Sequence, residues 1–197
     1  MTSIILASGS KYKAALLRRL SLPFAIDYPN INEYATEGEL PNQTAERLAL
    51  KKAKSVARNN IGAIVIGADQ IADLNGQAIN KSEGHTAAVE QLKRQSGQKV
   101  AFHSGLAIVC CRPNGRLEHF SCVNSTTVTF RTLHEHQIES YLRTEEPYDC
   151  AGSFKAEGLG ISLFTRIEST DPTSLIGLPL IDLCSLLIKF DVKINNK

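Results

Sequence analysis

The chain has 197 residues, of which 43% are apolar and 21% are charged, a composition typical of a soluble globular protein. Its formal net charge of +2 is too close to neutral for a general nucleic-acid-binding surface, so we expect no stable nucleic-acid partner. No apolar stretch approaches the roughly 20 residues that span a bilayer, and the first residues do not resemble a signal peptide. The sequence therefore predicts a cytoplasmic protein without a membrane segment.

The cysteine pattern agrees with a reducing compartment. Five cysteines is an odd number, they form no C-x-x-C pair, and they lie in apolar segments where cysteine acts as a small hydrophobic residue. We expect a structural and not a redox role for Cys110, Cys111, Cys122, Cys150 and Cys184, and no zinc site among the histidines.

A strand, a loop and a helix open the chain. The strand is predicted over Ile4–Ala7 and the helix over Ala14–Leu20, and the loop between them contains Ser8, Ser10 and Lys13. Free backbone N–H groups and the positive end of the helix dipole favour an anion at this place. The loop therefore indicates a phosphate site, with an ordinary capped connection and a solvated lysine as the alternative.

A second helix is predicted over Asn42–Asn59, and a buried strand over Ala63–Gly67. Lys52 lies within the apolar face of that helix, so its ammonium must either extend to solvent or meet an anion. Asp69 follows the strand, at the carboxyl end where open α/β sheets present ligand-binding groups, although a turn-forming aspartate would also fit. The remaining cations of the helix follow the spacing of a solvated face: Arg47, Lys51, Lys54 and Arg58.

The second half of the chain adds a hairpin and more helices. A helix is predicted over Thr86–Gln95, and strands over Val100–Cys111 and Leu117–Phe130 meet at an Arg-Pro-Asn-Gly turn, which makes part of the sheet antiparallel.

A capping box of Thr132 and Glu135 predicts the start of another helix, which should stop before Pro147. A strand is expected over Ile161–Ile167 and a last helix over Leu180–Lys189.

These elements predict an α/β fold, with residues 1–197 forming a single domain that has a mixed sheet and two lobes around a cleft. Glu33, Lys52, Asp69 and Lys81 lie at element ends or against apolar faces. Two carboxylates with two lysines are the residue types of a metal and phosphate site.

Several segments together resemble the Maf family of nucleotide pyrophosphatases, and the similarity runs almost from end to end. Their order and spacing are more specific than any single motif. The segment 151–158 is similar to the branch of that family that prefers 7-methyl-GTP. The matching segments are Leu6-Ala7-Ser8-x-Ser10, Arg47-x-Ala49-x-x-Lys52-Ala53, Gly67-x-Asp69-Gln70, Lys81, Cys150-Ala151-Gly152-Ser153-Phe154-Lys155 and Gly177-Leu178-Pro179-Leu180.

The resemblance implies an inosine-triphosphatase-like (Maf/Ham1) fold, with a mixed twisted sheet, flanking helices and a central cleft. It implies hydrolysis of 7-methyl-GTP to 7-methyl-GMP and pyrophosphate, which would limit incorporation of modified nucleotides, with Mg²⁺ or Mn²⁺ as cofactor. A dTTP/UTP pyrophosphatase is the alternative, disfavoured because Glu157 stands where that branch has glutamine. A second alternative is a non-catalytic nucleotide-binding regulator of cell division. The sequence leaves open whether the protein is a monomer or a homodimer.

The resemblance also assigns roles. Asp69 matches the family's proposed catalytic acid, and Glu33 with Asp69 is expected to hold the metal. Positions that match the substrate-specificity positions are Tyr12, Gln70 and Glu157, where an aromatic face and a carboxylate would suit the cationic 7-methylguanine. Positions expected to bind the phosphates are Ser8, Ser10, Lys13, Lys52 and Lys81.

Two positions depart from the family's pattern. The opening loop has Lys13 where the family has arginine, so a point charge replaces a guanidinium fork that binds phosphate bidentately. Ser82 replaces the proline that usually follows the family's lysine, which should loosen that turn while keeping Lys81.

Overall fold

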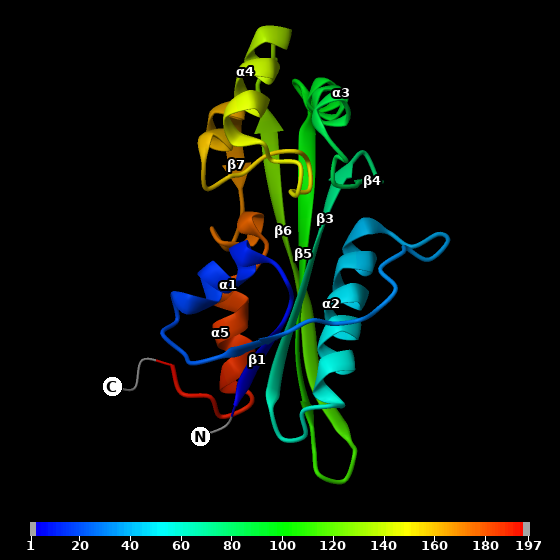
Figure 1. Cartoon of the computed structure of the whole chain (residues 1–197), viewed down its shortest axis with the longest axis vertical. Helices are drawn as coiled ribbons and strands as arrows, with labels where there is room; N and C mark the ends of the chain where they lie inside the picture. Colours follow the sequence, from blue (N-terminus) through cyan, green and yellow to red (C-terminus); the bar gives the residue numbers. More distant parts are fainter. Residues whose placement is uncertain (1–2, 195–197) are drawn as a thin grey trace.

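The computed structural model describes residues 3–194 and has a twisted seven-stranded sheet with helices on its faces (Figure 1). The strand order is β2-β1-β3-β5-β6-β7, and β4 pairs separately with β3. The strands are β1 (Ile4–Ala7), β2 (Ala25–Asp27), β3 (Ile64–Leu74), β4 (Gln77–Ile79), β5 (Lys99–Cys111), β6 (Leu117–Phe130) and β7 (Phe164–Glu168). The α-helices are α1 (Lys11–Arg18), α2 (Pro41–Ala57), α3 (His85–Gln95), α4 (Glu135–Glu145) and α5 (Leu180–Ile188), and η1 (Leu159–Leu163) and η2 (Ser174–Ile176) are 3₁₀ turns.

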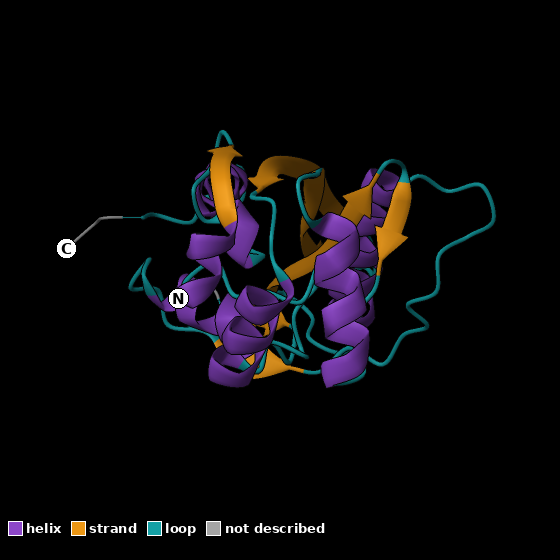
Figure 2. Cartoon of the chain, turned by 90° about the horizontal axis from the view of Figure 1, so that it is seen from above, coloured by secondary structure: helices purple, strands orange, loops and turns teal. Residues whose placement is uncertain are grey.

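The core consists of three apolar clusters placed along the long strands. One face of β3 and β5 packs against α1 and α5 near one end and against α3 and α4 near the other. The opposite face packs against α2. The loop between β2 and α2 extends away from this body, to the right in Figures 1 and 2. Within residues 3–194, no helix has the length and apolar character needed to cross a membrane.

The edge of β3 is interrupted. Strand β1 runs parallel to residues 64–67 of β3, and β4 runs antiparallel to residues 72–74. Residues 68–71 therefore lie between the two partner strands, while β5 pairs with β3 continuously on the other side. Because backbone polar groups at such an open edge need partners, this stretch is where other groups can approach the sheet.

Most predicted elements are confirmed, and two of the boundary errors lie at polar site residues. The strand predicted over Ala63–Gly67 continues to Leu74, so Asp69 is in mid-strand and not at the carboxyl end. The neighbouring strand β1 is the one that ends beside this part of β3, where Ala7 pairs with Gly67. The first helix begins at Lys11 and not at Ala14, because Ser10 is its N-cap. Both errors arise because polar site residues interrupt an apolar pattern without ending the element.

Two predictions from the second half are wrong. The capping box of Thr132 and Glu135 does not form: α4 starts one position beyond His134, whose backbone N–H donates to the side chain of Gln137 at 2.9 Å. The strand expected from residue 161 is a 3₁₀ turn as far as Leu163, and β7 follows it. The short strands β2 and β4 were not predicted.

Helix α2 lies very close to the sheet because two glycines face it. A β-carbon on Gly67 would be 2.2 Å from the carbonyl oxygen of Ala49, and one on Gly105 would be 2.1 Å from that of Ala45. No side chain fits in these gaps. The close approach brings Lys52, which is also in α2, over the middle of β3.

Gly67→Ala should therefore lower the free energy of unfolding by about 3 kcal/mol, since an added methyl group forces the helix from the sheet. Urea denaturation measures this. Thr127→Ala, half-buried on the same face beyond α2, should change it by less than about 0.5 kcal/mol. Equal midpoints for Gly67→Ala and the parent protein would contradict the close packing.

Candidate active site

The loop after β1 is built as a capped helix start that opens into a cleft. Ser8 is buried, and its Oγ accepts a hydrogen bond from the backbone N–H of Ser10 at 3.2 Å. The Oγ of Ser10 in turn accepts one from the N–H of Lys13 at 3.4 Å. The remaining first-turn N–H groups of α1 have no partner within the helix, and residues 8–13 line the cleft, so the helix start can serve as an anion site.

Lys13 reaches the interrupted edge of β3. Its Nζ donates a hydrogen bond to the carbonyl oxygen of Ala68 at 2.9 Å. Burial lowers the pKa of this lysine to about 8; the carboxylate of Asp69 opposes the change, and the charges of Lys52 and Lys81 add to it. Lys13 is therefore a cation held beside two others.

A buried ion pair lies at the centre of the cleft. The Nζ of Lys52 is 2.5 Å from Oδ1 of Asp69 and 3.0 Å from Oε2 of Glu33. Lys52 and Asp69 keep only 8% and 7% of their surface exposed. Burial acts to lower the pKa of Lys52, but the two carboxylates outweigh it and the pKa is raised. The lysine therefore stays charged, and of the two alternatives that the sequence left open, it meets anions instead of extending to solvent.

The loop that carries Glu33 is tied to α2 by two of the cations predicted to be solvated. Arg47 forms an ion pair with Glu39 at 2.5 Å and donates to the backbone carbonyl of Tyr34 at 3.0 Å. Lys51 donates to the carbonyl of Asn32 at 3.0 Å. For Arg47 and Lys51 the solvated interpretation is therefore incomplete, because they hold Glu33 over the cleft.

Gln70 follows Asp69 on β3 and connects this strand by hydrogen bonds to β5 and η2. Its Nε2 lies 3.1 Å from the hydroxyl oxygen of Ser104 and 3.0 Å from the carbonyls of both Ser174 and Leu175, so its two N–H groups are shared among three acceptors. Among residues 3–194 only the amide nitrogen is engaged, and the carbonyl oxygen is the atom that could meet a nucleotide. Gln70 is thus a structural tie as well as a predicted specificity residue.

Lys81 is exposed, and its backbone pairs with Ala151 in an isolated antiparallel bridge. The neighbouring Ser82 is buried, and its hydroxyl has no hydrogen-bond partner in the described part of the chain. The bridge fixes the Lys81 backbone although Ser82 replaces a proline.

All ten predicted site residues line one cleft of about 1360 Å³. The structure brings together Ser8, Ser10, Tyr12, Lys13, Glu33, Lys52, Asp69, Gln70, Lys81 and Glu157. The sequence analysis missed other residues that line it, among them Tyr148 and Asp149. Their position directly before the recognised segment starting at Cys150 was the available signal.

Cationic and acidic side chains meet in the cleft. Lys52 and Lys81 lie near enough to Lys13 for their charges to lower its pKa. Burial raises the pKa of the Tyr12 hydroxyl, and the nearby carboxylates of Asp149 and Glu157 add to this change. The three lysines suit a polyanion, and the surroundings of Tyr12 suit a neutral or cationic group.

A buried carboxylate and lysine beside a helix N-terminus, in a cleft of an open mixed sheet, define a phosphate-processing α/β protein. The family described as Maf-like protein matches residues 3–190, and the chain belongs to this Maf family.

Proteins named 7-methyl-GTP pyrophosphatase are similar to the chain over most of its length. Those of a Polaromonas species and Ralstonia nicotianae are 48% and 49% identical, each over 93% of this chain and over 83% and 93% of their own lengths. That of Pseudomonas syringae is 47% identical over 98% of this chain and 100% of its own.

The Staphylococcus aureus Ham1 protein aligns with 97% of this chain and 100% of its own, with a TM-score of 0.52 and 12% identity. The predicted Maf/Ham1 fold is confirmed.

The depressed pKa of Lys13 predicts a pH dependence. As pH rises through about 8, Lys13 of the free protein loses its proton, so kcat/KM for GTP should fall as phosphate binding weakens. Lys13→Arg should move this decline to higher pH, because a guanidinium stays protonated. Steady-state rates from pH 6.5 to about 9.5 measure it. An identical alkaline decline in both proteins would exclude Lys13 as its cause.

Proposed function

We propose that the chain hydrolyses 7-methyl-GTP to 7-methyl-GMP and pyrophosphate, and so limits incorporation of the modified nucleotide. The printed names of its relatives support this substrate. The observation that carries the chemistry is the buried pair of Lys52 and Asp69, in a cleft that Lys13 and Lys81 also line.

Hydrolysis between the α and β phosphates depends on positioning a water and stabilising charge. In this proposal Asp69 accepts the proton of the attacking water at a carboxylate oxygen. Lys52 holds that carboxylate in place at 2.5 Å and faces the reacting phosphate. Lys13, Lys81 and the backbone N–H groups of α1 bind the remaining oxygens and the leaving pyrophosphate.

A divalent cation fits this site. Three lysines against the carboxylates of Glu33 and Asp69 leave a single positive charge, too little for a triphosphate. Both carboxylates come within 3.0 Å of one Lys52 atom, so their oxygens converge. Residues 3–194 contain no cluster of three or more His, Cys, Asp or Glu side chains suited to a metal ion.

Mg²⁺ commonly uses one or two carboxylates together with substrate phosphates and waters, and so needs no larger protein cluster. We propose Glu33 and Asp69 as ligands of Mg²⁺ or Mn²⁺. When bound, the ion neutralises phosphate charge and polarises the bond that breaks.

The first experiment measures pyrophosphate release from 7-methyl-GTP, GTP, dTTP, UTP and ITP, with Mg²⁺ or Mn²⁺. We expect selective cleavage of 7-methyl-GTP, and Asp69→Asn should reduce kcat by about a hundredfold or more, because the amide cannot accept the proton. EDTA should abolish turnover and Mg²⁺ should restore it.

A melting curve of Asp69→Asn serves as control, because the substitution also alters the buried pair with Lys52. Normal turnover by a folded Asp69→Asn protein would refute the role of Asp69. Selective cleavage of dTTP and UTP would keep the chemistry and replace the substrate. If the parent protein binds nucleotides but does not hydrolyse them, the alternative of a non-catalytic nucleotide-binding regulator would be favoured.

Glu157 should contribute to base recognition, since its exposed carboxylate lines the cleft and can accept hydrogen bonds from the N1–H and amino group of guanine. Glu157→Gln should lower kcat/KM for 7-methyl-GTP relative to dTTP by about tenfold. The same panel measures this ratio. An unchanged ratio would remove Glu157 from the recognition scheme.

A further inference from the structure

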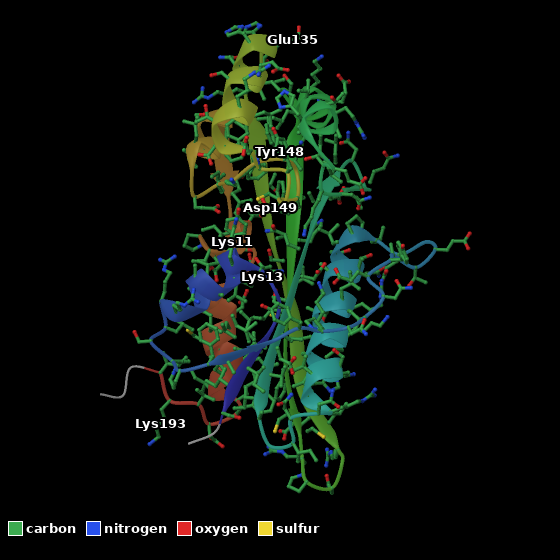
Figure 3. All side chains as sticks on the ribbon, viewed as in Figure 1. Lys11, Lys13, Glu135, Tyr148, Asp149 and Lys193 are labelled. Atoms are coloured by element: carbon green, nitrogen blue, oxygen red, sulfur yellow. The ribbon has the colours of Figure 1, made fainter. Side chains whose placement is uncertain are left out.

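Asp149 connects the loop between α4 and η1 with the start of α1. The hydroxyl oxygen of Tyr12 lies 3.4 Å from each of its two carboxylate oxygens, a long contact in which the one hydroxyl proton is shared between them. Its Oδ2 is also 3.6 Å from Nζ of Lys11. Figure 3 shows Asp149 directly beside Lys11 at the start of α1. A residue distant in sequence therefore orients the aromatic ring at a predicted specificity position.

Contacts with α3 and α4 hold the loop that carries Asp149 in place. The hydroxyl of its neighbour Tyr148 lies 3.0 Å from Nδ1 of His85, and Nε2 of the same histidine lies 3.0 Å from Glu139. The N–H of Cys150 closes a turn by donating to the carbonyl of Pro147 at 3.1 Å. These contacts with α3 and α4 direct Asp149 toward α1.

Asp149 is ionised. Its partial burial acts to raise the pKa, but the hydrogen bond from the Cys150 thiol and the charge of Lys11 outweigh it, and the pKa is lowered. A carboxylate thus stands beside the hydroxyl end of the Tyr12 ring.

A lysine of the chain itself contacts both the Tyr12 ring and the Asp149 carboxylate. Nζ of Lys11 lies 5.0 Å from the centroid of the Tyr12 ring while it pairs with Asp149. The Lys11 side chain is 73% exposed, so another cation can displace it at little cost. An aromatic face next to a carboxylate is the chemistry that recognises a delocalised cation.

We propose that Asp149 is a specificity-determining residue that selects a cationic purine base, by holding the Tyr12 ring and adding a negative charge beside it. This inference rests on the proposed function and deepens it. The 7-methylguanine ring carries a positive charge that guanine, thymine and uracil lack. Asp149 therefore favours the methylated substrate over GTP, although the phosphates of the two are the same.

The test compares kcat/KM for 7-methyl-GTP with that for GTP, because the ratio cancels effects on phosphate binding. Asp149→Asn keeps the shape and removes the charge, and should lower the ratio about five- to tenfold, mainly through KM. Asp149→Glu should restore part of it. Lys11→Met frees the ring and the carboxylate, and should raise the ratio.

Glu146→Gln is the matched control, because it removes one negative charge from the same loop at an exposed position outside the cleft. It should leave the ratio unchanged within about twofold. Melting curves establish that each variant is folded.

If the parent protein does not prefer 7-methyl-GTP, the proposed substrate fails. If it does and Asp149→Asn keeps the ratio, or Glu146→Gln lowers it equally, the role of Asp149 is overturned.

Discussion

The buried pair of Lys52 and Asp69 is the interaction on which the arrangement of the site depends. Neither charge could be buried alone, since an uncompensated ion in the interior costs several kcal/mol. The pair forms only because α2 approaches the sheet without a side chain between them, at Gly67 and Gly105. The close packing of α2 on the sheet is therefore also what brings the two charges together.

The cleft follows from the interrupted edge of β3. Since β1 stops early and β4 starts late, the Lys13 side chain of α1 can reach the exposed backbone of this strand. The middle of β3 then supplies Asp69 to one face of the sheet and Gln70 to the other, because successive strand residues alternate. One strand therefore both supports the central charge and ties down the opposite side of the cleft.

The sequence carries much of this information in local form. The lysine within an apolar helix face and the aspartate after a buried strand each signalled the site, because a charge in an apolar pattern needs a reason. The sequence could not reveal that β3 continues past Asp69, since its pairing with β5 is a long-range contact. The pairing of Tyr12 with Asp149 was equally inaccessible, because it depends on how a distant loop is braced.

In the proposed function the lysines set the orientation of the nucleotide. With the triphosphate on Lys13, Lys52 and Lys81, the base would lie beside Tyr12, whose neighbours include the carboxylates of Asp149 and Glu157. Helix α1 and strand β3 each carry residues of both kinds, since Lys13 follows Tyr12 and Gln70 follows Asp69. Asp149 and Glu157, by contrast, come from the loop after α4. Base preference can therefore change within that loop while the buried pair, and the chemistry that it supports, stays as it is.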